Sequence, residues 1–276
     1  MPEIPEMQAL AERLEAAVGG RDLTGVQPLQ FSALKTFAPD PATLVGRRLE
    51  GVGRRAKYLV LDFGEATMLI HLSQGGRVDV ESPPKTARTK QGVVRLTFGD
   101  TAALVKEFGH ERKAAWWVLP PGDDGPLGRL GPEPGTPEFA AYLRTAQDRR
   151  RVHTILRDQR TVSGIGRGYT DDALHRAGLS PYASLASLPA DDRERLLASI
   201  DSVLAAGLDV ERRRTGGLPN KVGDHWVVHG KVGQPCPVCG DTLHRVSYES
   251  YEVTYCPTCQ TDGKILADRR LSRLLK

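Results

Sequence analysis

Residues 236–259 read CPVCGDTLHRVSYESYEVTYCPTC and contain all four cysteines of the 276-residue chain. The cysteines form two C-x2-C pairs with sixteen residues between them. Thiolates at this spacing hold one tetrahedral zinc ion of the closed, structural kind. β-prone runs at 243–248 and 251–255 lie between the pairs, which favours a two-stranded ribbon. We therefore predict one structural zinc ion, bound by Cys236, Cys239, Cys256 and Cys259.

Two other uses of the cysteines are a redox dithiol and a pair of disulfides, of which disulfides fit a chain without an export signal least well. The spacing leaves open whether the ribbon contacts a ligand. Zinc ribbons serve nucleic-acid binding and plain scaffolding alike.

At the other end of the chain, residues 1–6 read MPEIPE. Removal of the initiator Met1 would expose Pro2 as a secondary amine beside the carboxylic acid of Glu3. An α-amine titrates near ~8, against ~10.4 for a lysine side chain, so at neutral pH it is in part a free-base nucleophile. The alternative is an ordinary N-terminus whose prolines introduce the first helix.

Composition and charge narrow the class of protein. No apolar run approaches the ~18–20 residues of a membrane span, and the first residues lack the basic segment and apolar run of a signal peptide, so we expect a cytoplasmic protein without a membrane partner. Residues 1–148 carry 18 basic against 19 acidic residues, and residues 149–276 carry 20 against 15. The basic half includes the clusters Arg149–Arg151 and Arg212–Arg214, which are consistent with phosphate contacts but are also typical of solvated helix faces.

The first half predicts one helix followed by strands. Apolar residues recur at helical spacing over residues 5–18, and Gly19-Gly20 ends that pattern. Short β-prone runs then follow, at 57–63, 67–72, 93–98 and 114–118. Runs of this kind with tight turns favour a β-sandwich or barrel layered with the first helix. Proline and glycine at 120–126 and 131–135 mark a linker.

Beyond the linker the pattern is helical. Thr136 and Pro137 form a helix start, and a further helix is expected over about 188–206. Between them, three glycines in five residues open a helix at Gly164, Gly166 and Gly168. Such a run can present backbone N–H groups to a phosphate, although a structural turn is the commoner use.

Taken together, these motifs resemble the formamidopyrimidine-DNA glycosylase / endonuclease VIII family over nearly the whole chain. The matching stretches are PEIPE at 2–6, RAKYL at 55–59, HL at 71–72, LGPEP at 130–134, GIG at 164–166 and CPTCQ at 256–260. The resemblance implies an α+β fold with an N-terminal β-sandwich and flanking helix, a helix-two-turn-helix domain and the zinc ribbon. The implied boundaries are 1–120 for the catalytic domain, 121–135 for the linker, 136–230 for the helical domain, 231–260 for the ribbon and 261–276 for a basic tail.

The resemblance also implies base-excision repair by a DNA glycosylase with AP lyase activity, acting on a damaged, oxidised base. Pro2 would attack the sugar C1′, and Glu3 would protonate the ring oxygen, with Glu6 in the same catalytic set. Lys57 would contact phosphate and serve in β-elimination. The lesion must be flipped out of the duplex. This costs free energy of unstacking, which phosphate contacts and inserted side chains offset. The implied DNA contacts are His71, Gln74, Phe108, His153, Gly166, Arg167 and Tyr251.

Several of these positions depart from the family's pattern. Arg167 stands where the family has Asn, and His153 replaces a phosphate-binding Lys with a side chain that is only partly charged at neutral pH. Tyr251 replaces an Arg that grips the phosphates around the flipped nucleotide and is tied to δ-elimination. The resemblance therefore does not imply the second strand cut.

The residues that fill the gap left by the flipped base also differ. Gln74 occupies the position of an inserted Met, and Glu107 precedes Phe108 where an Arg is expected. A carboxylate at Glu107 would repel DNA and could not read an orphaned cytosine, so opposite-base selection should differ. Trp226 could stack on a base, although a core position is more common for tryptophan.

Two functions of different class fit the sequence. One is an active, monomeric glycosylase and lyase acting on damaged DNA with an altered lesion preference. The other is a protein on the same scaffold that binds damaged or distorted DNA without catalysis. A zinc-ribbon transcription module is a weaker third candidate, because most of the chain lies outside the ribbon.

Overall fold

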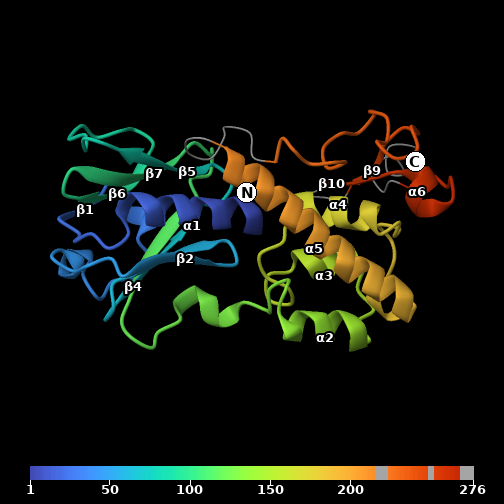
Figure 1. Ribbon diagram of the computed structural model, residues 1–276, viewed down its shortest axis with the longest axis horizontal. Coiled ribbons are helices and arrows are strands. Elements are labelled where there is room, and N and C mark those ends of the chain that lie inside the picture. The colour runs from blue at the N-terminus through green and yellow to red at the C-terminus, as the bar shows by residue number, and fades with distance from the viewer. Residues whose placement is uncertain (215–222, 248–251, 268–276) are drawn as a thin grey trace. The chain divides into compact units, whose positions relative to one another are not determined.

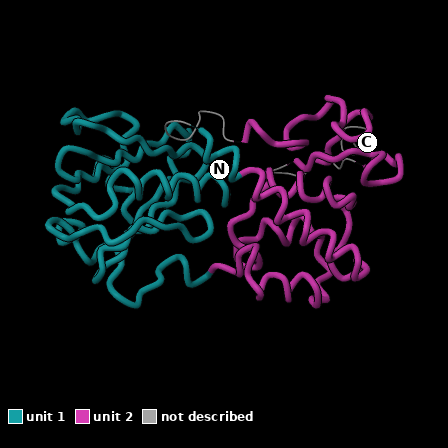
Figure 2. The backbone as a smooth tube through the Cα atoms, viewed as in Figure 1, with its two compact units in different colours: residues 1–129, 208–222 teal, residues 130–207, 223–276 magenta. Residues whose placement is uncertain are grey.

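The computed structural model describes residues 1–214, 223–247 and 252–267. The chain divides into two compact units (Figure 2). Unit 1 comprises residues 1–129 and 208–222, and unit 2 comprises residues 130–207 and 223–276.

Unit 1 begins with helix α1 (Ile4–Val18), close to the predicted 5–18. A capping box starts it: the Glu3 side chain accepts the N–H of Glu6, and the Glu6 side chain accepts the N–H of Glu3. Gly19 follows its last turn, where a Cβ would lie 2.5 Å from the Glu15 carbonyl oxygen. The helix therefore ends at the residue type that this close backbone approach requires.

The strands of unit 1 form two four-stranded antiparallel sheets (Figure 1). One sheet has the order β1-β6-β7-β5 and the other β2-β3-β4-β8. The bounds are β1 Gly25–Pro28, β2 Gly51–Arg55, β3 Tyr58–Asp62, β4 Thr67–His71, β5 Gly76–Glu81, β6 Gly92–Phe98, β7 Thr101–Glu107 and β8 Ala115–Leu119. Short 3-10 turns connect them at Phe31–Ala33 (η1) and Pro41–Leu44 (η2), and Gly125–Arg129 (η3) follows β8.

One apolar core joins α1 to both sheets. Met7, Leu10 and Leu14 of α1 are buried in the same cluster as residues of both sheets, among them Leu59 and Val105. Burial of side chains from both sheets and the helix is what makes the unit a layered sandwich. The predicted β-sandwich with a flanking helix is confirmed.

Unit 2 contains α2 (Pro137–Thr145), α3 (Val152–Arg157), the turn η4 (Leu185–Ser187), α4 (Arg167–Arg176) and most of α5 (Ala190–Arg213). The hydroxyl of Thr136 accepts the N–H of Phe139 at 3.3 Å, as the sequence predicts for a cap of α2. Helix α5 runs seven residues beyond the predicted end at 206. The helix continues through Gly207. Glycine is required there by packing, because a Cβ would come within 2.3 Å of the Tyr169 hydroxyl.

The C-terminal part of unit 2 is the expected ribbon. Strand β9 (His244–Ser247) pairs antiparallel with β10 (Glu252–Tyr255), and the short helix α6 (Pro257–Thr261) follows. No helix in the described ranges combines the length and apolarity needed to cross a membrane.

Candidate active site and metal centre

The start of α1 places the predicted nucleophile in a buried setting. Pro2 and Glu3 are buried, whereas Met1 is exposed. In the chain as it stands the Pro2 nitrogen is part of the Met1–Pro2 amide, so it becomes an amine only when Met1 is removed. An exposed Met1 ahead of a buried Pro2 suits that removal.

Glu6 is the carboxyl that holds this turn together. Its Oε2 accepts the N–H of Glu3 at 2.8 Å, and its side chain is completely buried. Burial, and after it the neighbouring charge of Glu3, raises the pKa of Glu6 to about 7. Glu6 can therefore hold or release a proton near neutral pH.

Glu211, which the sequence analysis missed, is a buried carboxyl of unit 1 whose charge acts on Glu6. Arg214 lies 2.9 Å from its Oε1, and Arg13 donates to its backbone carbonyl at 2.7 Å. The Glu211 charge contributes to raising the pKa of Glu6. The only signal in the sequence was the basic run that follows it.

Lys57 occupies the two-residue loop between β2 and β3, where Arg55 pairs with Tyr58. Ala56, the other residue of the loop, has a φ of 51°. This left-handed conformation is unfavourable for a residue with a Cβ. Lys57 is nevertheless only 5% exposed. Burial restricts the positions that the Lys57 side chain can take. A catalytic side chain needs such a fixed position.

His71 ends β4 near the same groups. Its ring lies 4.8 Å from that of Tyr58. Burial, together with the positive charges of Lys57 and the chain's N-terminal amine, lowers the pKa of His71 to about 4. The structure thus brings His71, Lys57 and the chain terminus into one electrostatic neighbourhood, with a neutral imidazole at pH 7.

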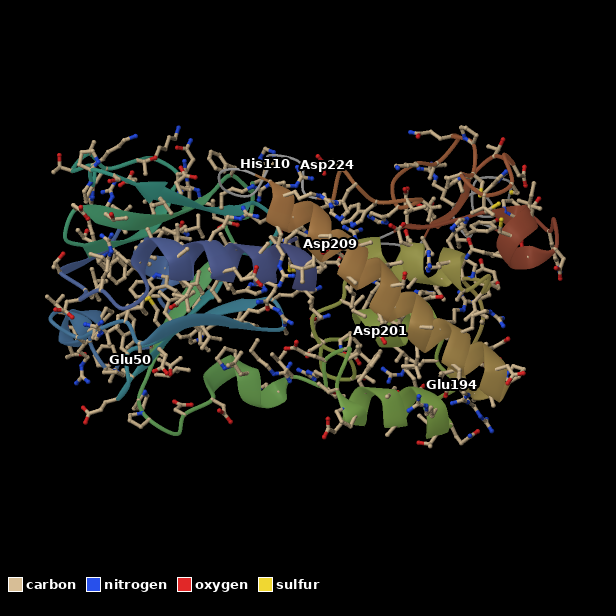
Figure 3. The ribbon with its side chains drawn as sticks, viewed as in Figure 1. Glu50, His110, Glu194, Asp201, Asp209 and Asp224 are labelled. Carbon is tan, nitrogen blue, oxygen red and sulfur yellow. The ribbon has the colours of Figure 1, made fainter. Side chains whose placement is uncertain are left out.

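Gln74 and Phe108 lie on two loops that line one pocket of about 590 Å³ in unit 1. The Phe108 N–H donates to the carbonyl of Gly75 at 3.0 Å. A Cβ on Gly75 would lie 2.3 Å from the Gly109 nitrogen, so the loops can approach only through glycine. The pocket also includes Ser73, Arg77, Glu107, Gly109, His110 (labelled in Figure 3), Glu111, Arg112 and Lys113.

Phe108 is an exposed ring with a cation beside it. More than half of its side chain is accessible, and Lys106 Nζ lies 5.5 Å from the ring centroid. Lys106 also forms an ion pair with Asp79. The exposed ring is therefore positioned by neighbours rather than by burial.

The interpretation of Glu107 as a carboxylate facing DNA is wrong. Glu107 is 3% exposed, and its two oxygens accept the N–H groups of Lys113 at 3.0 Å and Ala114 at 2.7 Å. These bonds close the loop that carries Phe108. Its carboxylate is a structural clamp, so it gives no reason to expect repulsion of DNA.

The glycine run forms a supported turn at the start of α4. Gly164 has a φ of 94°, and Gly166 is the N-cap residue. The Gln159 side chain accepts the N–H of Gly164 at 2.9 Å and donates to the carbonyl of Ile165 at 2.8 Å. Arg167 is exposed at the first position of the helix. An exposed arginine at the start of a helix can bind an anion.

His153 needs a correction. Its side chain has no exposed surface, and burial lowers its pKa to about 4. A covered, neutral ring does not supply the partial charge predicted for a phosphate contact. Tyr251 lies outside the described residues.

The arginine clusters are largely engaged within the chain. Arg150 pairs with Asp148 and Asp158, and Arg151 lies 4.0 Å over the Tyr182 ring. Arg212 pairs with Glu12 at 2.7 Å. These contacts within the chain do not mark the two clusters as dedicated phosphate contacts.

Trp226 has the packed position that was the commoner alternative. A Cβ on Gly168 or on Gly223 would fall within 2.2 Å of its indole. The ring also meets His229 edge-on, with centroids 4.4 Å apart. The tryptophan therefore packs inside unit 2 against the first turn of α4.

The four cysteines form one cluster. Their sulfur atoms all lie within 4.8 Å of one another, with Cys236 3.9 Å from Cys259 and Cys239 3.4 Å from Cys256. Sulfur atoms around a tetrahedral zinc ion with ~2.3 Å bonds are about 3.8 Å apart. The donor set and its spacing fit zinc, and the predicted single structural ion is confirmed.

Three family models match the chain in succession. They are the formamidopyrimidine-DNA glycosylase N-terminal domain over residues 1–114, the formamidopyrimidine-DNA glycosylase H2TH domain over 130–216, and the zinc finger found in FPG and IleRS over 233–261.

Curated relatives match over nearly full length. A formamidopyrimidine-DNA glycosylase of Chloroflexus aurantiacus is 33% identical over 276 residues, covering 94% of this chain and 98% of the relative. One of Thermus thermophilus is 32% identical over 280 residues, covering 95% and 100%. An uncharacterised formamidopyrimidine-DNA glycosylase-like protein of Mycobacterium tuberculosis is 42% identical over 154 residues, covering 53% of this chain and 94% of the relative.

A solved structure shares the fold. Lactococcus lactis formamidopyrimidine-DNA glycosylase, bound to DNA containing an AP site, aligns with a TM-score of 0.80 at 23% identity. The alignment covers 94% of this chain and 99% of that one. At this identity the likeness establishes the architecture.

Proposed function

Since this chain belongs to the formamidopyrimidine-DNA glycosylase family, we propose that its buried N-terminal proline makes it a base-excision DNA glycosylase with AP lyase activity. Its substrate is a damaged, oxidised base in DNA. The observation that carries the proposal is the placement of Pro2, Glu3, Glu6 and Lys57 as buried residues of one unit.

The proposed reaction begins with the Pro2 amine that Met1 removal exposes. Its nitrogen attacks C1′ of the lesion, the bond from C1′ to the base breaks, and the base leaves with a proton. Glu3, once it has taken up a proton, gives that proton to the sugar ring oxygen, so the ring opens and the nitrogen forms an iminium with C1′. Loss of a proton from C2′ then expels the 3′ phosphate in β-elimination, and water releases the sugar fragment from Pro2.

The surroundings favour the free amine. Burial and nearby positive charge both oppose protonation of an amine. Pro2 is buried, and Lys57 lies in the neighbourhood that lowers the pKa of His71. The first turn of α1 adds the positive end of a helix dipole.

Lys57 and Glu6 have complementary proposed roles. Lys57 holds a DNA phosphate and assists β-elimination from its fixed hairpin position. Glu6, with a pKa of about 7, holds a proton beside Glu3 and fixes the backbone that carries Pro2. His71 is proposed to donate a hydrogen bond to phosphate as a neutral ring.

Besides Lys57 and His71, the proposed DNA contacts are exposed side chains. Phe108 and Gln74 are exposed on adjoining loops and are suited to fill the gap left by a flipped nucleotide. Arg167, exposed at the start of α4 directly after Gly166, is suited to a phosphate contact. By contrast, Asp201 and Asp209 are exposed acids on α5 (Figure 3), and their charges would repel DNA, whereas the charge of Glu194 is paired with Arg144.

We further propose that strand cleavage stops after β-elimination, because Tyr251 stands where the δ-elimination arginine is expected. We also propose that the protein acts on DNA as a monomer in the cytoplasm. Size-exclusion chromatography with light scattering would give a mass near 30.1 kDa for a monomer.

The test is a panel of duplexes, each carrying one oxidised base, scored separately for free base and for cleaved strand. We expect base release from at least one lesion, with a 3′ unsaturated aldehyde and no 3′ phosphate. Glu3→Gln should lose base release, whereas Lys57→Gln should retain more base release than strand cleavage. Tight binding to the damaged duplexes without release of any base would support the DNA-binding alternative and contradict the proposal.

A further inference from the structure

One face of α4 contacts the part of unit 2 that carries the cysteines. Asp171, Asp172 and His175 occupy this face, since residues four apart lie on the same side of a helix. The Asp172 carboxylate accepts the N–H groups of Val227 at 2.7 Å, Val228 at 2.9 Å and His229 at 3.1 Å. These bonds fix the segment that leads into the first cysteine pair.

Asp171 holds the second part of the same region. Its Oδ2 accepts the N–H of Thr254 in β10 at 3.0 Å and lies 2.6 Å from Nδ1 of His229. Both carboxylates are almost completely buried. The helix therefore fastens the ribbon through specific polar contacts, and not through apolar packing alone.

His175, in the last turn of α4, makes the contact that reaches the metal centre. Its Nε2 lies 3.2 Å from Sγ of Cys236, within hydrogen-bond distance for a sulfur acceptor. The His175 side chain is 6% exposed, and Cys236 is 3% exposed. Buried hydrogen-bond partners of this kind orient metal ligands, and their loss typically weakens metal binding ~10–100-fold.

We propose that His175 is a positioning residue of the zinc site, donating its Nε2–H to the thiolate of Cys236. The hydrogen bond fixes the sulfur in the orientation that the ion requires and opposes its dissociation. It also makes α4 part of the metal centre. Helix α4, which begins at the glycine turn, therefore carries His175 one residue before its end, and His175 helps to retain the zinc ion.

Zinc release tests the proposal in the zinc-loaded full-length protein. His175→Phe removes the donor and keeps a ring, whereas His175→Gln keeps an N–H donor. His244→Phe is the matched control, because His244 also lies in unit 2 but faces the Tyr255 ring, with centroids 6.2 Å apart. An excess of the chromogenic chelator 4-(2-pyridylazo)resorcinol reports the rate of release.

We expect His175→Phe to release zinc about tenfold faster or more, with His175→Gln between it and the wild type and His244→Phe unchanged. Equal rates for His175→Phe and the wild type would overturn the proposal. Equally fast release from His175→Phe and His175→Gln would also overturn it, since packing rather than donation would then explain the effect.

A second measurement needs no variant and remains decisive if His175→Phe fails to fold. In the cadmium-113-loaded wild-type protein, NMR with 15N-labelled histidine identifies the protonated ring nitrogen of His175. We expect an Nε2–H whose proton shows scalar coupling to cadmium through the N–H···S bond. An Nδ1–H tautomer, or an Nε2–H without that coupling, would contradict the donation.

Discussion

The N–H of Glu3 donates a 2.8 Å hydrogen bond to Oε2 of Glu6, a buried carboxyl whose pKa is raised to about 7. This bond closes the capping box at the first turn of α1. It fixes the backbone immediately after Pro2, so the residue that shapes the turn is also a proton-holding group. The Glu6 carboxyl therefore both shapes the first turn of α1 and holds a proton beside the proposed nucleophile.

Replacing Glu6 should change how stability depends on pH. Because the folded pKa rises from 4.5 to about 7, ionisation penalises the folded state of the wild type progressively across that window. Glu6→Gln should match the wild type below pH 4.5 and exceed it above pH 7, by up to roughly 3 kcal/mol. Thermal unfolding at pH 4.5 and pH 8 measures both differences.

The control for this prediction is Glu50→Gln, since Glu50 is exposed in the same unit (Figure 3). That change should leave the difference between the two pH values unaltered. A Glu6→Gln variant that is equally shifted at both pH values would show that the capping bond, and not ionisation, dominates.

The loop contact at Gly75 predicts a steric effect. A Cβ there would lie 2.3 Å from the Gly109 nitrogen, so Gly75→Ala must push the Gln74 and Phe108 loops apart. We expect a loss of about 1–3 kcal/mol in the free energy of unfolding. Denaturant titration would measure it, with Gly53→Ala as control, because a Cβ on Gly53 meets nothing within 4 Å. Equal stability of the two variants would contradict the loop geometry.

Arg167 at the start of α4 should contribute one phosphate contact. Arg167→Gln should weaken binding to abasic-site DNA about tenfold, and reduce the slope of log affinity against log salt by about 1. Fluorescence anisotropy over a salt series measures both quantities. Arg47→Gln is the control, since Arg47 pairs with Glu65 in unit 1. An unchanged slope for Arg167→Gln would remove this residue from the DNA contacts.

Removal of the metal should disrupt the ribbon. Elemental analysis should find one zinc per chain, and Cys256→Ser should lower that content because it removes one of four ligands. Chelation should lower the thermal midpoint, and added zinc, but not magnesium, should restore it. A chelated protein that unfolds at the same temperature as the loaded protein would contradict a structural role for the ion.

Short sequence patterns correctly predicted the first helix, the start of α2 and the ribbon. The helix at 5–18 follows from its own apolar spacing, the Thr136 cap from the residues beside it, and the ribbon from two C-x2-C pairs sixteen residues apart, and each is observed. The predicted end of α5 was wrong, because Gly207 lies inside the helix. The reason for a glycine at this position is the Tyr169 ring, which leaves no room for a Cβ and is distant in the sequence. The bounds of the five predicted segments and the role of Tyr251 stay predictions.

The residue types of the candidate site could be predicted from the sequence, whereas the directions in which some of its side chains point could not. Pro2, Glu3, Glu6 and Lys57 are all buried in unit 1, as a shared site requires. The inward direction of Glu107 and the burial of His153 depend on backbone amides and neighbours that no spacing rule identifies. Glu211 and His175 act through contacts with residues far away in the chain, so their roles appear only in the folded protein.

The central claim is that Pro2 forms the covalent bond to DNA. Borohydride reduction of a mixture of the protein and abasic-site DNA, followed by protease digestion and mass spectrometry, locates the trapped sugar. We predict an adduct on the nitrogen of Pro2 in Met1-free protein, greatly reduced in Pro2→Gly and absent when Met1 is retained. An adduct on Lys57, or no adduct in protein shown to lack Met1, would contradict the account.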